Sequence, residues 1–371
     1  MRSFSQKILI STNSSCNLKC IYCFEKNKHK FEFDINKAIT IISNLLSIKT
    51  EFGTKIKIHG GEPFLVFEKI RALCESLWEA DYPEYFQVHI TTNGTLVHGE
   101  IQKWLYKNRD RVILKLSIDG DKKSNDINRP NSFNQIDLPF FVKTWPLIVA
   151  SMTITPKTLP YLYENIRFLH KSGFRYIVTQ LSLLTDWSKY NLQEEYYYQI
   201  TKLTHYYLDN PHIHPFFSWI NIEDTLYSET KPSCGIGHMK AYDFQSNQYF
   251  PCQMCFPSAC GNKTSSDLQK INFKDKSILT NSTCSSCPFI NICVTCYAEN
   301  YISRGDVAKR DMNICSYQKC FFAAVFKFEY ARILKENRPT TKDIMKMTAI
   351  LKWQKEISET INCFMDRNED N

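Results

Sequence analysis

Fifteen cysteines are the residues of this chain most able to do chemistry. The N-terminal segment offers only a three-residue apolar patch and no secretory cleavage site, so we expect a cytoplasmic protein. Reducing cytosol disfavours structural disulfides and directs dense cysteine towards metal binding or catalysis. The function is therefore expected to depend on these thiols.

The first group of thiols is Cys16, Cys20 and Cys23, spaced C-x3-C-x2-C just after a strand-like run at residues 7–12. Three thiolates on one tight loop can hold three irons of a cubane and leave the fourth open to a small chelating ligand. Zinc is the alternative, and it would take a fourth protein ligand, for which His29 is the only nearby candidate.

The second group of thiols lies between residues 234 and 320. Its members are Cys234, Cys252, Cys255, Cys260, Cys284, Cys287, Cys293, Cys296, Cys315 and Cys320. By themselves, the paired C-x2-C segments within it suggest a structural zinc ribbon. Outside both groups, Cys74 is expected in the core, and no role is expected for Cys363.

The elements that must position these thiols follow a βαβ rhythm. Strands are expected at residues 7–12, 55–61, 86–94, 112–120, 147–154 and 176–183, and helices at 36–52, 68–80, 100–108 and 159–173. This pattern predicts an α/β protein with a partial (β/α)6 TIM-like barrel. Because barrel sites form at the carboxyl ends of strands, the polar segments that follow the first four strands should meet at one mouth.

On these features the sequence resembles the radical SAM superfamily, from about Ile8 to Ser182. The resemblance rests on the C-x3-C-x2-C spacing, with Tyr22 before the third cysteine, and on strand-end segments in matching order. It implies a [4Fe-4S] cluster held by the three cysteines and S-adenosylmethionine as cofactor. The segment Gly60, Gly61, Glu62, Pro63 would hold the methionyl amine of that cofactor. Asn93, Ser117, Asp119 and Arg129 would line its ribose and carboxylate side.

The second group resembles the SPASM extension, which carries two auxiliary [4Fe-4S] clusters. The resemblance assigns one cluster to Cys284, Cys287, Cys293 and Cys315. The other would take Cys234, Cys252 and Cys296, with an open iron or a ligand such as Cys255 or Cys260. Two departures from the pattern are the lack of a further cysteine soon after Cys234 and the two-residue spacing of Cys293 and Cys296.

The resemblance implies reductive cleavage of S-adenosylmethionine to a 5′-deoxyadenosyl radical that abstracts a substrate hydrogen; the catalytic residues beyond the cofactor ligands are unknown. We expect a ribosomally made precursor peptide as substrate, with a cross-link, thioether or epimer as product. A sulfatase maturase that makes formylglycine is the alternative, but Gln253 stands where such enzymes have an acid. A non-enzymatic zinc-binding module is the alternative from another class.

The expected domains are a radical SAM core at residues 1–225, a cysteine-rich iron–sulfur domain at 226–325 and a C-terminal helical tail at 326–371. Helices are expected at 319–337 and 342–357, and the aromatic run at 196–208 should be core more than peptide groove. The net charge of +8 is scattered, so nucleic acid is not expected, and no apolar run could span a membrane. Flavodoxin or ferredoxin would supply electrons, and a separate leader-binding protein is a candidate partner.

Overall fold

The computed structural model describes residues 4–27, 31–227 and 234–365. The chain forms two compact units that alternate along the sequence. The first unit comprises Met1–Thr153, Lys171–Ile177 and Gly235–Lys274, and the second comprises Ile154–His170, Val178–Cys234 and Asp275–Asn371. The domain boundaries expected at residues 225 and 325 follow from the cysteine pattern along the sequence, and they stay a prediction.

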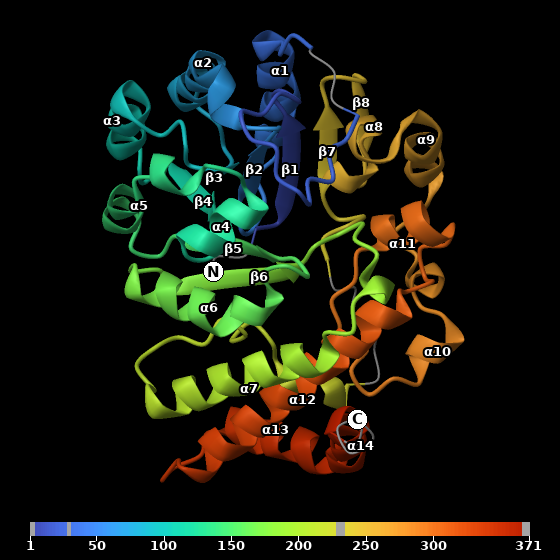
Figure 1. Cartoon of the computed structure of the whole chain (residues 1–371). Helices are drawn as coiled ribbons and strands as arrows, with labels where there is room; N and C mark the ends of the chain where they lie inside the picture. Colours follow the sequence, from blue (N-terminus) through green and yellow to red (C-terminus); the bar gives the residue numbers. More distant parts are fainter. Residues whose placement is uncertain (1–3, 28–30, 228–233, 366–371) are drawn as a thin grey trace. The chain divides into compact units, whose positions relative to one another are not determined.

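The first unit is built from strands that alternate with helices (Figure 1). Its strands are β1 (Gln6–Ser11), β2 (Thr54–His59), β3 (Phe86–Thr92), β4 (Val112–Ser117) and β5 (Val149–Ile154), and the chain then adds β6 (Tyr176–Leu181). The helices between them are α1 (Ile35–Leu46), α2 (Phe67–Glu79), α3 (Gly99–Lys107), α4 (Lys122–Asn128) and α5 (Leu138–Thr144). β1 to β5 pair in parallel, each with the next strand in sequence. The α/β class and the TIM-like βα repeat predicted from the sequence are confirmed.

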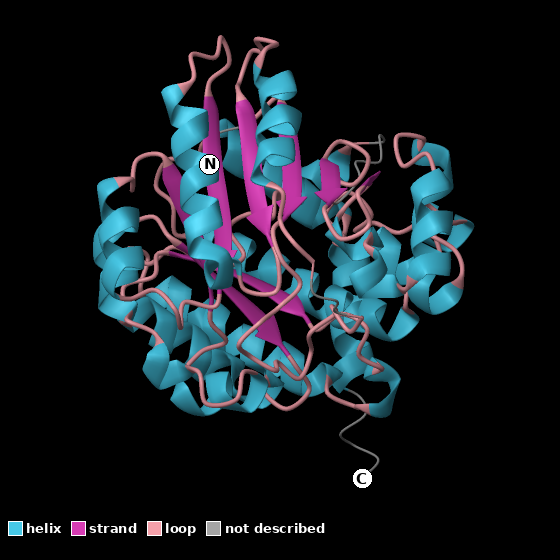
Figure 2. Cartoon of the chain, turned by 90° about the horizontal axis from the view of Figure 1, so that it is seen from above, coloured by secondary structure: helices cyan, strands magenta, loops and turns pink. Residues whose placement is uncertain are grey.

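The two faces of these strands differ in chemistry. In β2, Ile56 and Ile58 are buried, whereas the alternating Lys55, Lys57 and His59 are half-buried. Because side chains alternate across a strand, the apolar set faces the covering helices and the basic set occupies the opposite face. Figure 2 shows helices running alongside the parallel strands.

The sheet contains two strands more than the six expected from the βα repeat. The strand order is β6-β5-β4-β3-β2-β1-β7-β8, where β7 (Lys240–Asp243) is parallel to β1 and β8 (Gln248–Phe250) is antiparallel to β7. The buried Ser11 hydroxyl donates to Asp243 Oδ1 at 2.8 Å and ties β7 to the end of β1. Asn247 adopts a left-handed conformation, φ 60°, in the turn between β7 and β8. β7 and β8 therefore extend the sheet beyond the strands of the βα repeat.

Helices form most of the second unit. They include α6 (Leu162–Lys171), α7 (Gln193–Asp209), α11 (Tyr297–Arg304), α12 (Met312–Leu334), α13 (Thr341–Lys352) and α14 (Gln354–Met365). The aromatic run expected to be core is largely core: Tyr196 and Tyr207 on α7 are buried, and the Tyr196 ring lies 5.8 Å from that of Tyr317 on α12. The single helix expected at 342–357 is divided between α13 and α14 at Trp353, which ends α13 outside helical geometry.

Candidate functional site

The N-terminal cysteines lie on the loop that follows β1, as the sequence predicts. All three are half-buried. The Cys23 N–H donates to the Cys20 carbonyl at 3.1 Å, and the Ile21 N–H donates to the Asn128 carbonyl at 3.0 Å. Backbone hydrogen bonds therefore fix the loop both internally and against the C-terminal end of α4.

N–H groups surround the sulfurs of this loop. The Leu18 N–H donates to Cys16 Sγ at 3.4 Å, and Asn93 Nδ2 donates to the same sulfur at 3.9 Å. Arg129 Nη1 donates to Cys20 Sγ at 3.9 Å. Burial raises the pKa of Cys20, while the Arg129 charge lowers it. N–H donors and a cation beside sulfur stabilise thiolates, which are the form that binds iron.

Gly60 and Gly61 allow the cysteine loop to pass directly over the end of β2. A Cβ on Gly60 would lie 2.7 Å from the Asn13 carbonyl oxygen, and one on Gly61 would lie 2.1 Å from that of Ser15. The Gly61 N–H donates to Asn13 at 3.1 Å and the Glu62 N–H to Ser15 at 2.8 Å. The two glycines therefore permit the cysteine loop to pack directly against the end of β2.

Glu62 joins the ends of β2 and β3. Its fully buried carboxylate accepts hydrogen bonds from the Thr92 hydroxyl at 2.7 Å, the Asn93 N–H at 2.8 Å and the Phe64 N–H at 3.2 Å. Burial raises the pKa of Glu62, and these three donors lower it. The carboxylate is thus engaged by the protein itself, and its role towards the methionyl amine stays a prediction. Pro63 is buried at the start of a short 3-10 helix.

Asn93 holds the loop after β3 against the cysteine loop. Its Nδ2 donates to Asn17 Oδ1 at 3.0 Å, and its Oδ1 accepts from the Thr95 N–H at 2.9 Å and hydroxyl at 2.7 Å. Ser117 is half-buried at the end of β4. The structure therefore brings the ends of β2, β3 and β4 to the cysteine loop, as predicted.

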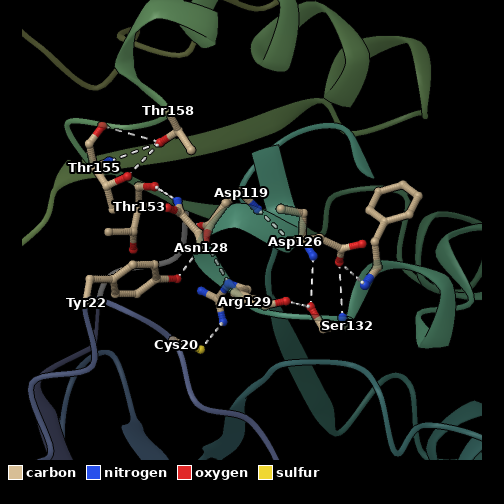
Figure 3. Close-up of polar contacts among 12 residues, drawn as sticks. Cys20, Tyr22, Asp119, Asp126, Asn128, Arg129, Ser132, Thr153, Thr155 and Thr158 are labelled. Carbon is tan, nitrogen blue, oxygen red and sulfur yellow. Dashed lines mark hydrogen bonds and ion pairs between the residues drawn. The ribbon is translucent and has the colours of Figure 1, made fainter. Parts of the chain in front are cut away.

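Asp119 is the centre of a buried polar network beside the cysteine loop (Figure 3). Its Oδ2 accepts from the Tyr22 hydroxyl at 2.7 Å and from Arg129 Nε at 2.9 Å, and its Oδ1 accepts from the Thr153 N–H at 2.7 Å. The Arg129 guanidinium also lies 5.3 Å from the centre of the Tyr22 ring. The Asp119 charge keeps the pKa of Arg129 above its usual range, although burial opposes it, and burial raises the pKa of Tyr22.

This arrangement fits the predicted cluster. Three half-buried thiols on one loop receive N–H donors from separate elements, and the Arg129 guanidinium, itself paired with Asp119, lies beside Cys20. Arg129 was predicted from the resemblance beside the cofactor carboxylate. The structure shows its side chain bound to Asp119 and directed to Cys20, and contact with the cofactor stays a prediction.

A second set of thiols comes together in the second unit. Cys284 lies in α10 (Ser282–Ser285), Cys287 in the following turn, Cys293 just beyond, and Cys315 in the first turn of α12. Cys284 and Cys287 raise the pKa of both Cys293 and Cys315. Cys315 also raises the pKa of Cys293. These are the four residues predicted to hold one auxiliary cluster.

Arg310 is the cation of this four-cysteine group, defined as Cys284, Cys287, Cys293 and Cys315. Its Nη1 donates to Cys293 Sγ at 2.8 Å, and its buried Nε has no hydrogen-bond partner. Burial raises the pKa of Cys293 to about 12, and the charge of Arg310 opposes that shift. Across the described residues, no carboxylate forms an ion pair with this guanidinium. A half-buried cation without a carboxylate requires other negative charge, which metal-bound thiolates would supply.

The remaining predicted ligands are divided between the units. Cys252 belongs to the first unit, whereas Cys234 and Cys296 belong to the second. Cys234 is exposed, and Cys296 begins α11, where its sulfur accepts from the Glu299 N–H at 3.5 Å. Their assignment to one auxiliary cluster with Cys252 stays a prediction.

Cys252 has cysteine neighbours of its own. Its sulfur lies 3.7 Å from that of Cys255, which is buried, and Cys260 affects the pKa of Cys255 electrostatically. The sulfur-to-sulfur hydrogen bond between Cys252 and Cys255 lowers the pKa of Cys252. Cys255 therefore lies beside the predicted cluster ligand Cys252, and whether Cys255 or Cys260 is itself a ligand stays a prediction.

No three His, Cys, Asp or Glu side chains converge as ligands of a single metal ion within residues 4–27, 31–227 and 234–362. Ligands of a cubane bind separate irons and so lie farther apart than ligands of one ion. His29, the fourth ligand considered for zinc, lies outside the described residues, as does the side chain of Cys363. Cys74 and Cys320 are buried, so the expectation of core for Cys74 is confirmed.

Comparison with known proteins identifies the class. Residues 10–137 match the radical SAM superfamily. This part of the chain is a radical SAM domain, a class of domain that implies S-adenosylmethionine and a [4Fe-4S] cluster as cofactors.

Two sequence relatives illustrate how far the likeness extends. An uncharacterized protein of Methanocaldococcus jannaschii is 29% identical over 236 residues, which is 59% of this chain and 80% of that protein. A probable GTP 3′,8-cyclase of Methanocella arvoryzae is 36% identical over 120 residues, or 30% of this chain. The match spans only 35% of that cyclase.

Solved structures share the fold over most of the chain. Native anSMEcpe with bound AdoMet and the Cp18Cys peptide matches with a TM-score of 0.65 at 19% identity, covering 89% of this chain and 98% of that one. Streptococcus suis SuiB bound to precursor peptide SuiA matches with a TM-score of 0.55 at 18% identity, covering 84% and 76%. The described helices of this chain include none long and apolar enough to cross a membrane.

Sequence reasoning missed the charged residues around the thiols. Arg310 lies in the segment VAKRD, which matches no motif, and only the fold brings it to Cys293. It likewise missed Lys57 and Lys115. The alternation along their strands places them on one face, but it does not reveal that no carboxylate of the described residues pairs with them.

Proposed function

We propose that this radical SAM enzyme modifies a ribosomally made precursor peptide. The observation that carries the proposal is the fold shared over 89% of the chain with anSMEcpe, whose structure contains AdoMet and a peptide. The likeness to SuiB bound to precursor peptide SuiA supports the same substrate class. The matches to GTP 3′,8-cyclases cover about a third of the chain and support only the radical SAM part.

The chain's own residues would hold and shield the cofactors. Cys16, Cys20 and Cys23 would ligate three irons of the cluster and leave the fourth for S-adenosylmethionine. When bound, S-adenosylmethionine and the reduced cluster would supply a 5′-deoxyadenosyl radical for hydrogen abstraction from the substrate. The backbone bonds of Gly61 and Glu62 to the cysteine loop would keep its geometry fixed during that chemistry.

Two auxiliary [4Fe-4S] clusters are part of this proposal. The four-cysteine group offers a full set of thiolates, and Arg310 offsets part of their charge. Cys234, Cys252 and Cys296 would serve the other cluster, with Cys255 or Cys260 as candidates for its fourth ligand. A reductant such as flavodoxin or ferredoxin and a separate leader-binding protein are proposed partners.

Sulfatase maturation to formylglycine is the second candidate. The fold of anSMEcpe fits it as well, but the residue after Cys252 is Gln253 and not an acid. The Gln253 amide oxygen is buried without a hydrogen-bond partner, so this position presents a neutral acceptor. An amide cannot take up a proton as a carboxylate base does, and we therefore favour the precursor peptide.

The test begins with anaerobic reconstitution, iron and sulfide counting, and a 5′-deoxyadenosine assay with dithionite and S-adenosylmethionine. Three cubanes predict about twelve irons per chain. Peptides encoded beside the gene are then incubated with the enzyme and examined by mass spectrometry. A mass change in such a peptide supports the proposal. Zinc in place of iron, or cofactor cleavage that modifies a sulfatase cysteine or serine and no precursor peptide, would contradict it.

A further inference from the structure

A row of basic side chains lies on the face of the sheet opposite the apolar core. Lys55 and Lys57 on β2, His89 on β3 and Lys115 on β4 all occupy half-buried positions that alternate with buried aliphatic residues. In register, Lys57 lies opposite His89, and Lys115 lies opposite Thr91. Lys57 and Lys115 are therefore the lysines of this row nearest the carboxyl ends of their strands, where the cysteine loop begins.

These cations repel one another. Burial and the charges of Lys57, Lys7 and Lys115 lower the pKa of Lys55 to about 8. Burial and Lys57 lower the pKa of Lys115 to about 8. Burial, then Lys55 and Lys57, lower the pKa of His89 to about 3, so its imidazole is neutral. Several positive charges are thus held together out of bulk water.

The described chain supplies no carboxylate to this row. Lys57 and Lys115 form no hydrogen bond or ion pair there, and the only raising influence on the pKa of Lys57 is Cys252. Glu25, near the end of β2, pairs through its Oε1 with His59 Nε2 at 2.8 Å and forms no ion pair with these lysines among the described residues. Buried cations ordinarily have partners, because burial without one is costly.

We propose that Lys57 and Lys115 bind a carboxylate group of the substrate, supplied by a glutamate or aspartate side chain of the peptide. The inference rests on the proposed peptide substrate and names the chemistry that this face recognises. Two ammonium groups on β2 and β4, either side of β3, can act as point-charge donors to one anion, and partial burial strengthens each contact. The cysteine loop follows the same sheet edge, so a carboxylate held here would anchor the peptide near the radical chemistry.

The methionyl carboxylate of S-adenosylmethionine has the same chemistry, and the experiment separates the two sources. Reconstituted full-length enzyme is acetylated anaerobically with limiting acetic anhydride at pH 8, and modification of each lysine is followed by peptide mass spectrometry. The probes are N-acetylglutamic acid α-amide, its neutral counterpart N-acetylglutamine amide, and S-adenosylmethionine, with matched ionic strength.

We expect the glutamate probe to slow acetylation of Lys57 and Lys115 at least threefold, while the glutamine probe leaves it unchanged. The exposed Lys107 on α3 serves as the internal control and should react equally in all samples. Lys115→Gln should reduce protection of Lys57, and Lys115→Arg should retain it. If Lys115→Gln fails to fold, the probe comparison on the unaltered enzyme still decides the question.

Equal acetylation with both amino-acid probes would overturn the proposal. Protection by S-adenosylmethionine with none from the glutamate probe would also overturn it, because the carboxylate would then belong to the cofactor. Both outcomes are independent of peptide modification: an enzyme that modifies a precursor peptide but shows no carboxylate protection keeps its proposed function and loses this inference.

Discussion

The N-terminal cysteine loop and the C-terminal four-cysteine group each place one arginine against a sulfur. Arg129 reaches Cys20 at 3.9 Å while its Nε is bound to the buried Asp119. Arg310 reaches Cys293 at 2.8 Å, and its buried Nε has no hydrogen-bond partner in the part of the chain that the structure describes. The first arginine is already neutralised by a carboxylate, whereas the second offers a full charge to its thiols.

This difference matches the number of thiolates at each place. Three thiolates with an open iron bring less negative charge than four, so a neutralised arginine suffices beside them. A four-thiolate cluster is more negative and is stabilised by an unneutralised cation. The two regions therefore illustrate one rule, in which the protein matches its fixed charge to the charge of the expected centre.

The largest effect is expected from removing the N-terminal ligands. The Cys16/Cys20/Cys23→Ala triple variant should lose 5′-deoxyadenosine formation to background and about four irons, because the cofactor needs the open iron of that cluster. A Cys284/Cys287→Ala variant should lose the auxiliary cluster but retain cofactor cleavage. Iron counting and nucleoside chromatography measure both. Retained cleavage by the triple variant would break the distinction between the two sites.

Asp119→Asn should lower the free energy of unfolding by about 3–5 kcal/mol, because it leaves the buried Arg129 charge without its carboxylate. Denaturant titration of the reconstituted protein measures this loss. Glu100→Gln is the matched control, since it removes only an exposed, solvent-screened ion pair to Lys103 and should leave stability almost unchanged. A similarly small change in Asp119→Asn would mean that Arg129 is not neutralised there.

Gly61→Ala should destabilise the protein by about 2–3 kcal/mol, because its Cβ would overlap the Ser15 carbonyl. The N-terminal loop should then lose iron while the four-cysteine group retains it. Gly235→Ala is the control, since its Cβ would meet nothing within 4 Å. Iron content and thermal unfolding are the measurements, and equal behaviour of the two variants would contradict the close packing at Gly61.

Arg310→Gln should lower the reduction potential of the auxiliary cluster proposed for the four-cysteine group by about 50 mV, because the added electron loses a nearby charge-assisted donor. Arg310→Lys should restore part of the shift. Redox titration monitored by electron paramagnetic resonance gives the potential. An unchanged potential in an iron-replete Arg310→Gln variant would show that the 2.8 Å contact does not tune the cluster.

Lys115 extends the comparison to a cation without thiolates. Its pKa falls from 10.5 unfolded to about 8 folded, so the folded state resists protonation and pays a stability cost below pH 8. That cost should disappear as pH rises from about 8 to 10.5, which favours the native protein by about 3 kcal/mol. Urea unfolding of wild type and Lys115→Met at pH 7 and pH 10 tests it. Parallel pH dependence of the two proteins would refute the shift.

The sequence predicted the positions of helices and strands in the βα repeat, because apolar periodicity and turn residues are local signals. The predicted strand at residues 112–120 and the helix at 100–108 correspond to β4 and α3. The addition of β7 to the sheet beside β1 was missed, because strand pairing across more than two hundred residues leaves no local trace. The break at Trp353 was missed because the amphipathic pattern continues through it.

For the site, sequence determined which residue types and spacings could bind metal: the C-x3-C-x2-C loop, the strand-end segments and the paired cysteines. Those features are encoded within a few residues of one another, where spacing alone limits geometry. Only the tertiary structure decided what surrounds them. In the folded chain Glu62 accepts hydrogen bonds from protein donors, and Arg129 pairs with Asp119. The fold also brings Arg310 to Cys293, and it groups Lys57 and Lys115 with no carboxylate from the described residues. Charge compensation acts through space, between residues that the chain order keeps apart.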